Sequence, residues 1–88
     1  MTDQNKMIEF PCNFPIKVFG KNETSFIVDI KNIAMKHDSE LTEKAFQTEI
    51  SAQGTYVSIT ITVRAKDQPS LDALYLELSS HPDVKMVL

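Results

Sequence analysis

The sequence is poor in the residues that build covalent or metal-based sites. It contains one cysteine, Cys12, so no internal disulfide can form, and this is typical of a protein of the reducing cytoplasm. No base or electropositive cluster accompanies Cys12, so we do not expect it to act as a nucleophile. The only histidines are His37 and His81, and neither has a second ligand at metal-binding spacing. We therefore expect no metal and no cofactor.

Long apolar runs and excess positive charge are absent as well. No apolar stretch approaches the roughly 20 residues that cross a bilayer, and Met1–Lys6 lacks the apolar segment of a secretory signal. The formal net charge is −3, which argues against nucleic acid as the main partner because a phosphate backbone selects clustered cations. The carboxylates are scattered without a recognisable acid–base pair, so we predict that the chain is not an enzyme.

The clearest pattern that is present lies in residues 54–65. Val57, Ile59, Ile61 and Val63 alternate with hydroxyl-bearing or charged residues. Strand side chains point to opposite faces in turn, and β-branched residues suit a pleated sheet. The pattern predicts a half-buried strand whose apolar face meets helices and whose other face stays in water.

The remaining elements are predicted from turn residues and apolar periodicity. Residues 24–36 and 69–78 repeat apolar side chains at helical spacing, and Pro69 suits the first turn of the second helix. Residues 16–20 and 44–51 read as strands. Residues 84–88 read as a final strand with Val84, Met86 and Leu88 on one face.

The predicted order β-α-β-β-α-β selects a fold class. Right-handed crossovers and two helices over one sheet face favour an α+β, ferredoxin-like βαββαβ plait with a four-stranded antiparallel sheet. The strands at Ile16 and Tyr56 would be central and the other two would be edges. We predict an extended lead-in over residues 1–13 and a single domain over residues 14–88.

Three blocks of sequence resemble the YbeD family of small uncharacterised bacterial proteins. They are Glu9–Gly20 (EFPCNFPIKVFG), Ser51–Ile61 (SAQGTYVSITI) and the closing LYLEL with DVKMVL. The resemblance covers nearly the whole chain and implies a ferredoxin-like plait similar to the ACT regulatory domain. ACT domains commonly dimerise and bind amino acids. No catalytic residues are attributed to the family, so the resemblance carries none over.

The loop after the first strand is the candidate ligand site. Gly20, Asn22 and Thr24 stand between strand and helix, where a glycine lets a ligand approach the backbone and free N–H groups can bind a carboxylate. The competing interpretation is that Gly20 only provides a turn and that Asn22 or Thr24 only caps the helix. Both remain open at the level of sequence.

The outer face of the predicted sheet is the candidate surface for RNA. Plaits that bind RNA stack bases on exposed aromatics of the central strands, and Phe19 and Tyr56 are the only candidates here. Lys17, Arg64, Lys66 and Lys85 could gather near this face. The small number of aromatics and the negative net charge argue against RNA binding.

The last strand is predicted to be an interface. Val84, Met86, Val87 and Leu88 form a short apolar edge, and an unpaired edge is a template for another chain. We expect a homodimer through this edge or through the helix layer.

The leading hypothesis is a non-enzymatic, ACT-like regulatory domain that binds a small ligand, such as an amino acid, or a partner protein. The alternative is a protein–protein interaction adaptor without a small-molecule site. An enzyme ranks third and an RNA-binding protein fourth.

Overall fold

A computed structural model of the chain describes residues 12–88. The elements are β1 (Cys12–Lys21), α1 (Thr24–His37), the 3-10 turn η2 (Glu43–Ala45), β2 (Phe46–Ile50), β3 (Tyr56–Ala65), α2 (Gln68–Ser79) and β4 (Val84–Val87). The part of the predicted lead-in that precedes Cys12 lies outside the described residues.

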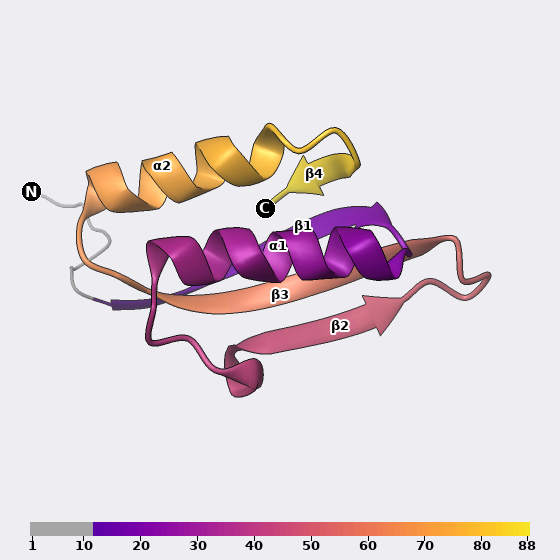
Figure 1. The fold of residues 1–88 in the computed structure, drawn as a ribbon, viewed down its shortest axis with the longest axis horizontal. Coiled ribbons are helices and arrows are strands. Elements are labelled where there is room, and N and C mark those ends of the chain that lie inside the picture. Colours follow the sequence, from indigo (N-terminus) through magenta and orange to yellow (C-terminus); the bar gives the residue numbers. More distant parts are fainter. Residues whose placement is uncertain (1–11) are drawn as a thin grey trace, which may run out of the picture.

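The four strands form one antiparallel sheet in the order β2-β3-β1-β4, as the sequence predicts. β1 and β3 are its centre and pair along their whole length, from Cys12 opposite Ala65 to Lys21 opposite Tyr56. Both helices pack over one face of this sheet (Figure 1). The ferredoxin-like plait is therefore confirmed.

Alternation along the central strands separates an apolar face from a polar one. On β3 the side chains at odd positions from Val57 to Ala65 are buried under the helices. On β1 Ile16 and Val18 are fully buried at the same level. Each such side chain contributes about 1.5–3 kcal/mol when taken out of water. The side of the sheet away from the helices is hereafter the open face.

The second helix, α2, combines a side-chain cap with the proline that the sequence predicts in its first turn. Asp67 is the N-cap, and its side chain accepts a hydrogen bond of 2.9 Å from the Ser70 N–H. The hydrogen bonds from Ser70 hold the pKa of Asp67 below its ordinary value of 3.8. Pro69 follows in the first turn, where its missing N–H leaves no partner unsatisfied. Leu71, Leu74 and Leu78 are buried against the sheet.

The first helix, α1, starts without a side-chain cap. Glu23 is its N-cap residue and makes no capping hydrogen bond, so the prediction that Asn22 or Thr24 caps the helix is wrong. Packing of Phe26, Ile30 and Ala34 into the core holds the helix instead.

Gly20 does not make the turn that the sequence suggests. β1 starts earlier than predicted, at Cys12, and it continues through Gly20 to Lys21. Of the two glycines only Gly54 has a positive φ, of 78°, in the β2–β3 hairpin. A Cβ on Gly20 would collide with the Phe26 ring and lie 2.6 Å from the Asp83 carbonyl oxygen. A glycine is therefore needed here because there is no room for a side chain.

A bulge changes the facing of β4. Val87 pairs with Val18 and Met86 with Phe19, but Gly20 pairs with Val84, so one extra residue sits in β4. Val84 and Val87 therefore pack against the core, while Met86 is 53% exposed on the open face. The predicted apolar face of Val84, Met86 and Leu88 is wrong for this reason.

Within residues 12–88 no helix is both long enough and apolar enough to span a membrane.

Candidate functional site

The space over Gly20, the first residue of the candidate ligand loop, is filled by the protein itself. Gly20 is buried in β1 beneath the ring of Phe26 and the carbonyl of Asp83. The Phe26 ring in turn meets His81 edge to face, with ring centroids 5.3 Å apart. His81 Nε2 lies 3.0 Å from Asp29 Oδ2. This end of the domain is thus closed by the connection between α2 and β4.

Asn22 and Thr24 lie at the surface beside this closed end. The Asn22 side chain donates a hydrogen bond of 3.0 Å to the Gly54 carbonyl, and its backbone N–H donates to the Thr55 carbonyl. Asn22 therefore ties the start of α1 to the β2–β3 hairpin. Thr24 is exposed in the first turn of α1. Whether a ligand binds these residues stays a prediction.

The predicted interface residues lie on or directly after β4, an outer strand of the sheet. Leu88 exchanges both backbone hydrogen bonds with Lys17, at 3.0 and 2.8 Å. Bonded and non-bonded pairs alternate along antiparallel strands. The N–H and C=O of Val87 consequently point away from β1, toward the free edge. The structure confirms that β4 is an edge, and pairing with a second chain stays a prediction.

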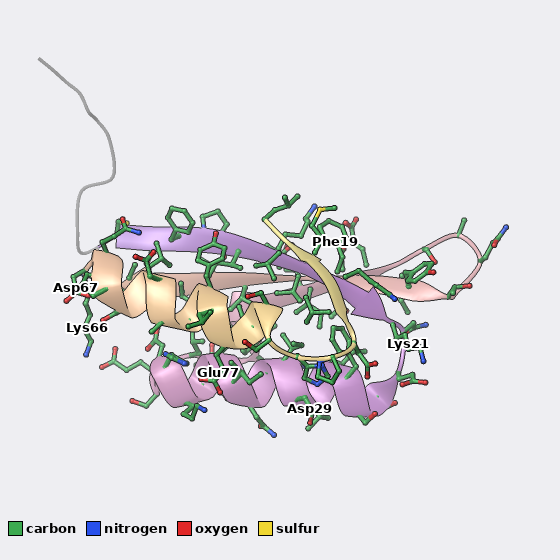
Figure 2. The ribbon with its side chains drawn as sticks, turned by 90° about the horizontal axis from the view of Figure 1, so that it is seen from above. Phe19, Lys21, Asp29, Lys66, Asp67 and Glu77 are labelled. Atoms are coloured by element: carbon green, nitrogen blue, oxygen red, sulfur yellow. The ribbon has the colours of Figure 1, made fainter. Side chains whose placement is uncertain are left out.

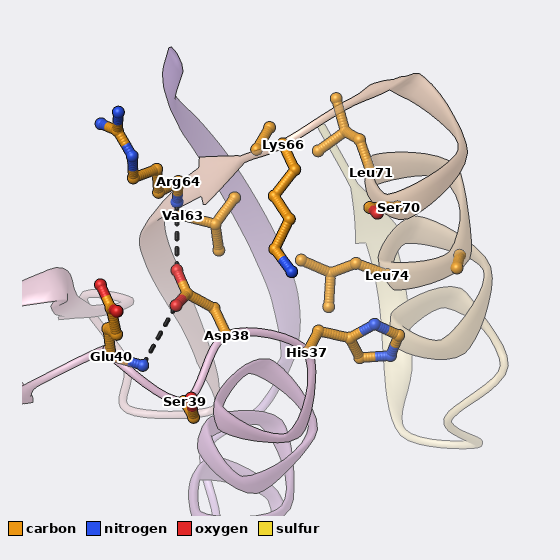
Figure 3. Close-up of a pocket in the computed structure, with 12 residues that line it drawn as sticks. His37, Asp38, Ser39, Glu40, Val63, Arg64, Lys66, Ser70, Leu71 and Leu74 are labelled. Carbon is orange, nitrogen blue, oxygen red and sulfur yellow. Dashed lines mark hydrogen bonds between the residues drawn. The ribbon is translucent and has the colours of Figure 1, made fainter. Parts of the chain in front are cut away.

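A pocket of about 440 Å³ opens at the opposite end of the domain. Three segments build it: the C-terminal end of α1 with the following loop, the end of β3, and the first half of α2 (Figure 3). Its lining is His37, Asp38, Ser39, Glu40, Val63, Arg64, Ala65, Lys66, Ser70, Leu71, Ala73 and Leu74. This volume is within the range of small-molecule sites.

Apolar side chains form the inner wall of the pocket and charged groups its rim. Val63, Ala65, Leu71 and Leu74 are all buried core residues. The ammonium of Lys66 points into the pocket toward Leu74 (Figure 3). Such a wall gives a ligand an apolar contact and leaves polar groups to orient it.

Asp38 is a fixed carboxylate on this rim. Its Oδ2 accepts a hydrogen bond of 3.2 Å from the Arg64 N–H, and its Oδ1 accepts one of 3.1 Å from the Glu40 N–H. The first bond ties the loop after α1 to β3, and the second lies within that loop (Figure 3). Each oxygen retains a lone pair for a further donor.

His37 belongs to a link between the two helices. Its Nε2 lies 2.8 Å from Glu77 Oε1, and Lys36 pairs with the other Glu77 oxygen. Hydrogen bonds from Lys36 and then His37 lower the pKa of Glu77 below its ordinary value of 4.5. Figure 2 shows Glu77 on α2 above α1. His37 thus borders the pocket with its imidazole already engaged.

The pocket lining combines charges of both signs with hydroxyl groups. It offers one ammonium, two carboxylates from Asp38 and Glu40, and the hydroxyls of Ser39 and Ser70. Within residues 12–88 no three histidine, cysteine or acidic side chains gather as a metal site would require. Cys12 is a free, partly buried thiol and does not line the pocket.

Sequence reasoning missed this pocket because its segments are separated along the chain. Lys66 and Arg64 were expected near the open face together. Arg64 does point away from the pocket, whereas Lys66 points into it (Figure 3). In the fold, the C-terminal ends of α1 and β3 lie beside the start of α2. This meeting of three element ends is the signal that could have located the site.

Comparison with known proteins identifies a family and several relatives of this chain. Residues 5–88 match a family model described as "Protein of unknown function (DUF493)". The chain is 45% identical over 82 residues to a UPF0250 protein of Janthinobacterium sp. (strain Marseille), covering 93% of this chain and 90% of the relative. It is 40% identical over 82 residues to a UPF0250 protein of Paraburkholderia phytofirmans, and the match covers 93% of this chain and 92% of the relative. A UPF0250 protein of Nitrosomonas europaea is 35% identical over 88 residues, and the match covers both chains completely.

Proposed function

The chain belongs to the DUF493 family, which is the UPF0250 or YbeD family that its sequence resembles, and we propose that it is a non-enzymatic regulatory protein that binds a small ligand. The observation that carries the proposal is the pocket at the ends of α1 and β3, which presents charges of both signs over an apolar wall. We propose a cytoplasmic location because its only cysteine is a free thiol.

The charge pattern of the pocket supports a zwitterionic ligand such as an amino acid. The Lys66 ammonium would pair with the ligand carboxylate, and Asp38 or Glu40 would accept hydrogen bonds from its amino group. Leu71 and Leu74 would contact an aliphatic side chain. Ligand binding would then act on the α1–β3 junction that Asp38 holds together.

The test compares three matched probes by thermal shift and amide NMR: leucine, 4-methylpentanoate without the amino group, and 3-methylbutylamine without the carboxylate. We expect leucine to raise the melting temperature most, because it alone matches both charges. A ligand at about 100 times its Kd adds about 2.7 kcal/mol of stability. A wider amino-acid panel follows with the same readout.

Variants assign any effect to the pocket. Lys66→Met removes the ammonium and keeps most of the side-chain length, and Asp38→Asn keeps an acceptor for the Arg64 N–H. Both should abolish the ligand-dependent shift, whereas Lys44→Met on the exposed η2 turn should retain it. Shifts that survive both pocket variants, or no shift with any amino acid, would refute the proposal.

The alternative function is an adaptor that binds a partner protein and no small molecule. The exposed apolar side chains of the open face, among them Tyr56 and Met86, favour it. It predicts a defined partner in a pull-down from cell extract and no stabilisation by any small ligand.

We also propose a homodimer through the edge formed by Val84, Met86, Val87 and Leu88. The outward N–H and C=O of Val87 are the groups that would pair with the second copy.

A further inference from the structure

The open face carries a cluster of apolar side chains that no other described element covers. Met86 stands opposite Phe19 across β4 and β1, and Leu88 stands opposite Lys17. Tyr56 on β3 is a diagonal neighbour of Phe19, within reach of an aromatic side chain. Phe19 lies on the side of the sheet away from α1 (Figure 2).

The exposure of this cluster is unusual for the domain. Tyr56 is 49%, Met86 53% and Leu88 61% exposed, and these are half of the large apolar side chains that the described surface exposes. The others, Val28, Ile50 and Leu76, lie on three different elements. Contiguous apolar patches mark interaction sites, whereas scattered single ones need no explanation.

A shallow hollow of about 320 Å³ adjoins the cluster. Phe19, Tyr56 and Ser58 line it from β1 and β3, and residues 49–51, at the end of β2 and just after it, border it. A hollow bordered by two aromatic rings can receive one aliphatic or aromatic side chain. Such buried anchors carry most of the energy of protein interfaces.

The charge of the open face has the opposite sign to that of the chain. Lys17 and Arg64 project from β1 and β3 onto the open face, and Glu49 on β2 is an acidic residue on the same face. The chain as a whole carries −3. An acidic partner would therefore be attracted to this face while the rest of the surface repels it.

Two other occupants fit the observations less well. A second copy placed symmetrically on this face would bring like-charged faces together. A nucleic acid base would need the face of the Phe19 ring, but Lys17 Nζ already lies over that ring, 5.8 Å from its centroid. Tyr56 alone would remain for stacking.

We propose that the open face binds a segment of another protein that carries an aliphatic or aromatic anchor flanked by Asp or Glu. The anchor enters the hollow beside Phe19 and Tyr56, and the carboxylates pair with Lys17 and Arg64. This inference does not depend on the ligand pocket, which lies on the helix side at one end of the sheet.

A displayed library of short random peptides tests the proposal directly. The full chain is immobilised at low salt, and enriched peptides are synthesised and measured by fluorescence anisotropy. We expect enriched sequences to combine Asp or Glu with Leu, Ile or Phe. Their affinity should fall as salt rises, because the charge pairs are exposed.

Variants within and outside the open face distinguish specific binding at this surface from nonspecific binding elsewhere. Phe19→Ser should weaken peptide binding by about tenfold or more, because the hollow that holds the anchor loses one of its two aromatic walls. Lys17→Glu should weaken them severalfold. The matched controls Leu76→Ser on α2 and Lys44→Glu on η2 change exposed residues outside the open face and should leave affinity unchanged. Circular dichroism confirms that each variant is folded.

Several outcomes would overturn the proposal. They are the absence of enrichment, enriched peptides without acidic residues, and peptides that bind Phe19→Ser as well as the original chain. Tighter binding of single-stranded oligouridylate than of every peptide would assign the face to nucleic acid. A dimer that Phe19→Ser dissociates would assign it to a second copy.

Discussion

Gly20 and Gly54 are the only glycines of the chain, and the fold uses a different property of each. Gly20 is buried where Phe26 and Asp83 leave no room for a side chain. Gly54 has a positive φ, and no atom lies within 4 Å of the place where a Cβ would stand, so it supplies conformation rather than space.

Substitution at the two glycines should therefore differ in kind. Gly20→Ala should lower the free energy of unfolding by about 1–3 kcal/mol, because the added methyl overpacks the core. Gly54→Asn should change it by about 0.5 kcal/mol or less, because asparagine tolerates positive φ. Urea denaturation measures both. Equal stability of Gly20→Ala and the original chain would show that the site can expand.

Local chemistry explains why sequence reasoning succeeded at Pro69 and failed at Asn22. Pro69 acts through its own ring, so its place in a first helical turn can be predicted from the sequence alone. The Asn22 amide could serve a cap or any nearby carbonyl, and it donates to Gly54, which is distant in the sequence. Only the fold decides between such partners.

At the scale of elements, α1 and α2 are joined where Lys36 forms an ion pair with Glu77 and His37 a hydrogen bond to it. The lowered pKa of Glu77 makes this link dependent on pH. The unfolded chain binds a proton at this carboxylate at higher pH than the folded chain does. The stabilising contribution is therefore complete above the ordinary value of 4.5 and is lost as pH falls through the lower folded pKa.

Glu77→Gln should flatten the acid side of the stability profile. The original chain should lose stability more steeply than the variant as pH falls below 4.5, and the two profiles should run parallel at neutral pH. Thermal melts across pH provide the measurement. Glu49→Gln on the open face is the control, and an identical acid slope in Glu77→Gln would contradict the link.

The bulge in β4 yields a second prediction for an element. Val87 packs against the core and Met86 does not, so Val87→Ala should cost about 1 kcal/mol of stability. Met86→Ala should stay within about 0.5 kcal/mol, as exposed substitutions do. The reverse order in urea denaturation would restore the unbulged register.

Alternation predicted the faces of β3 correctly and those of β4 incorrectly. β3 keeps one register against β1 over all ten residues and against β2 over Val57–Ile61, so the sequence pattern and the structure agree. In β4 one extra residue beside Gly20 shifts the pattern. A bulge cannot be recognised from the sequence of a four-residue strand in which apolar side chains occupy both faces.

At the scale of the whole molecule, the sheet order and helix layer could be predicted from six elements and the handedness of their crossovers. The pocket could not, because His37, Lys66 and Leu74 come from separate segments that only the assembled fold brings together. The open face was foreseen through Phe19 and Tyr56, but not the apolar contribution of Met86.

The proposed dimer has a selective test in Val87→Pro. Proline removes the outward N–H of Val87 and leaves the hydrogen bonds between β4 and β1 in place. The original chain should show a mass that rises with concentration in sedimentation equilibrium, and the folded variant should remain monomeric. A dimer that persists in the variant would move the interface to the helix layer.

The chain has no tryptophan, and its two tyrosines lie in contrasting surroundings. Tyr56 stands beside Phe19 on the open face, whereas partial burial on α2 raises the pKa of Tyr75. Replacing Tyr75 with phenylalanine would leave a single tyrosine fluorophore, at the surface proposed for docking. Its emission would then report occupancy of that surface without an attached dye.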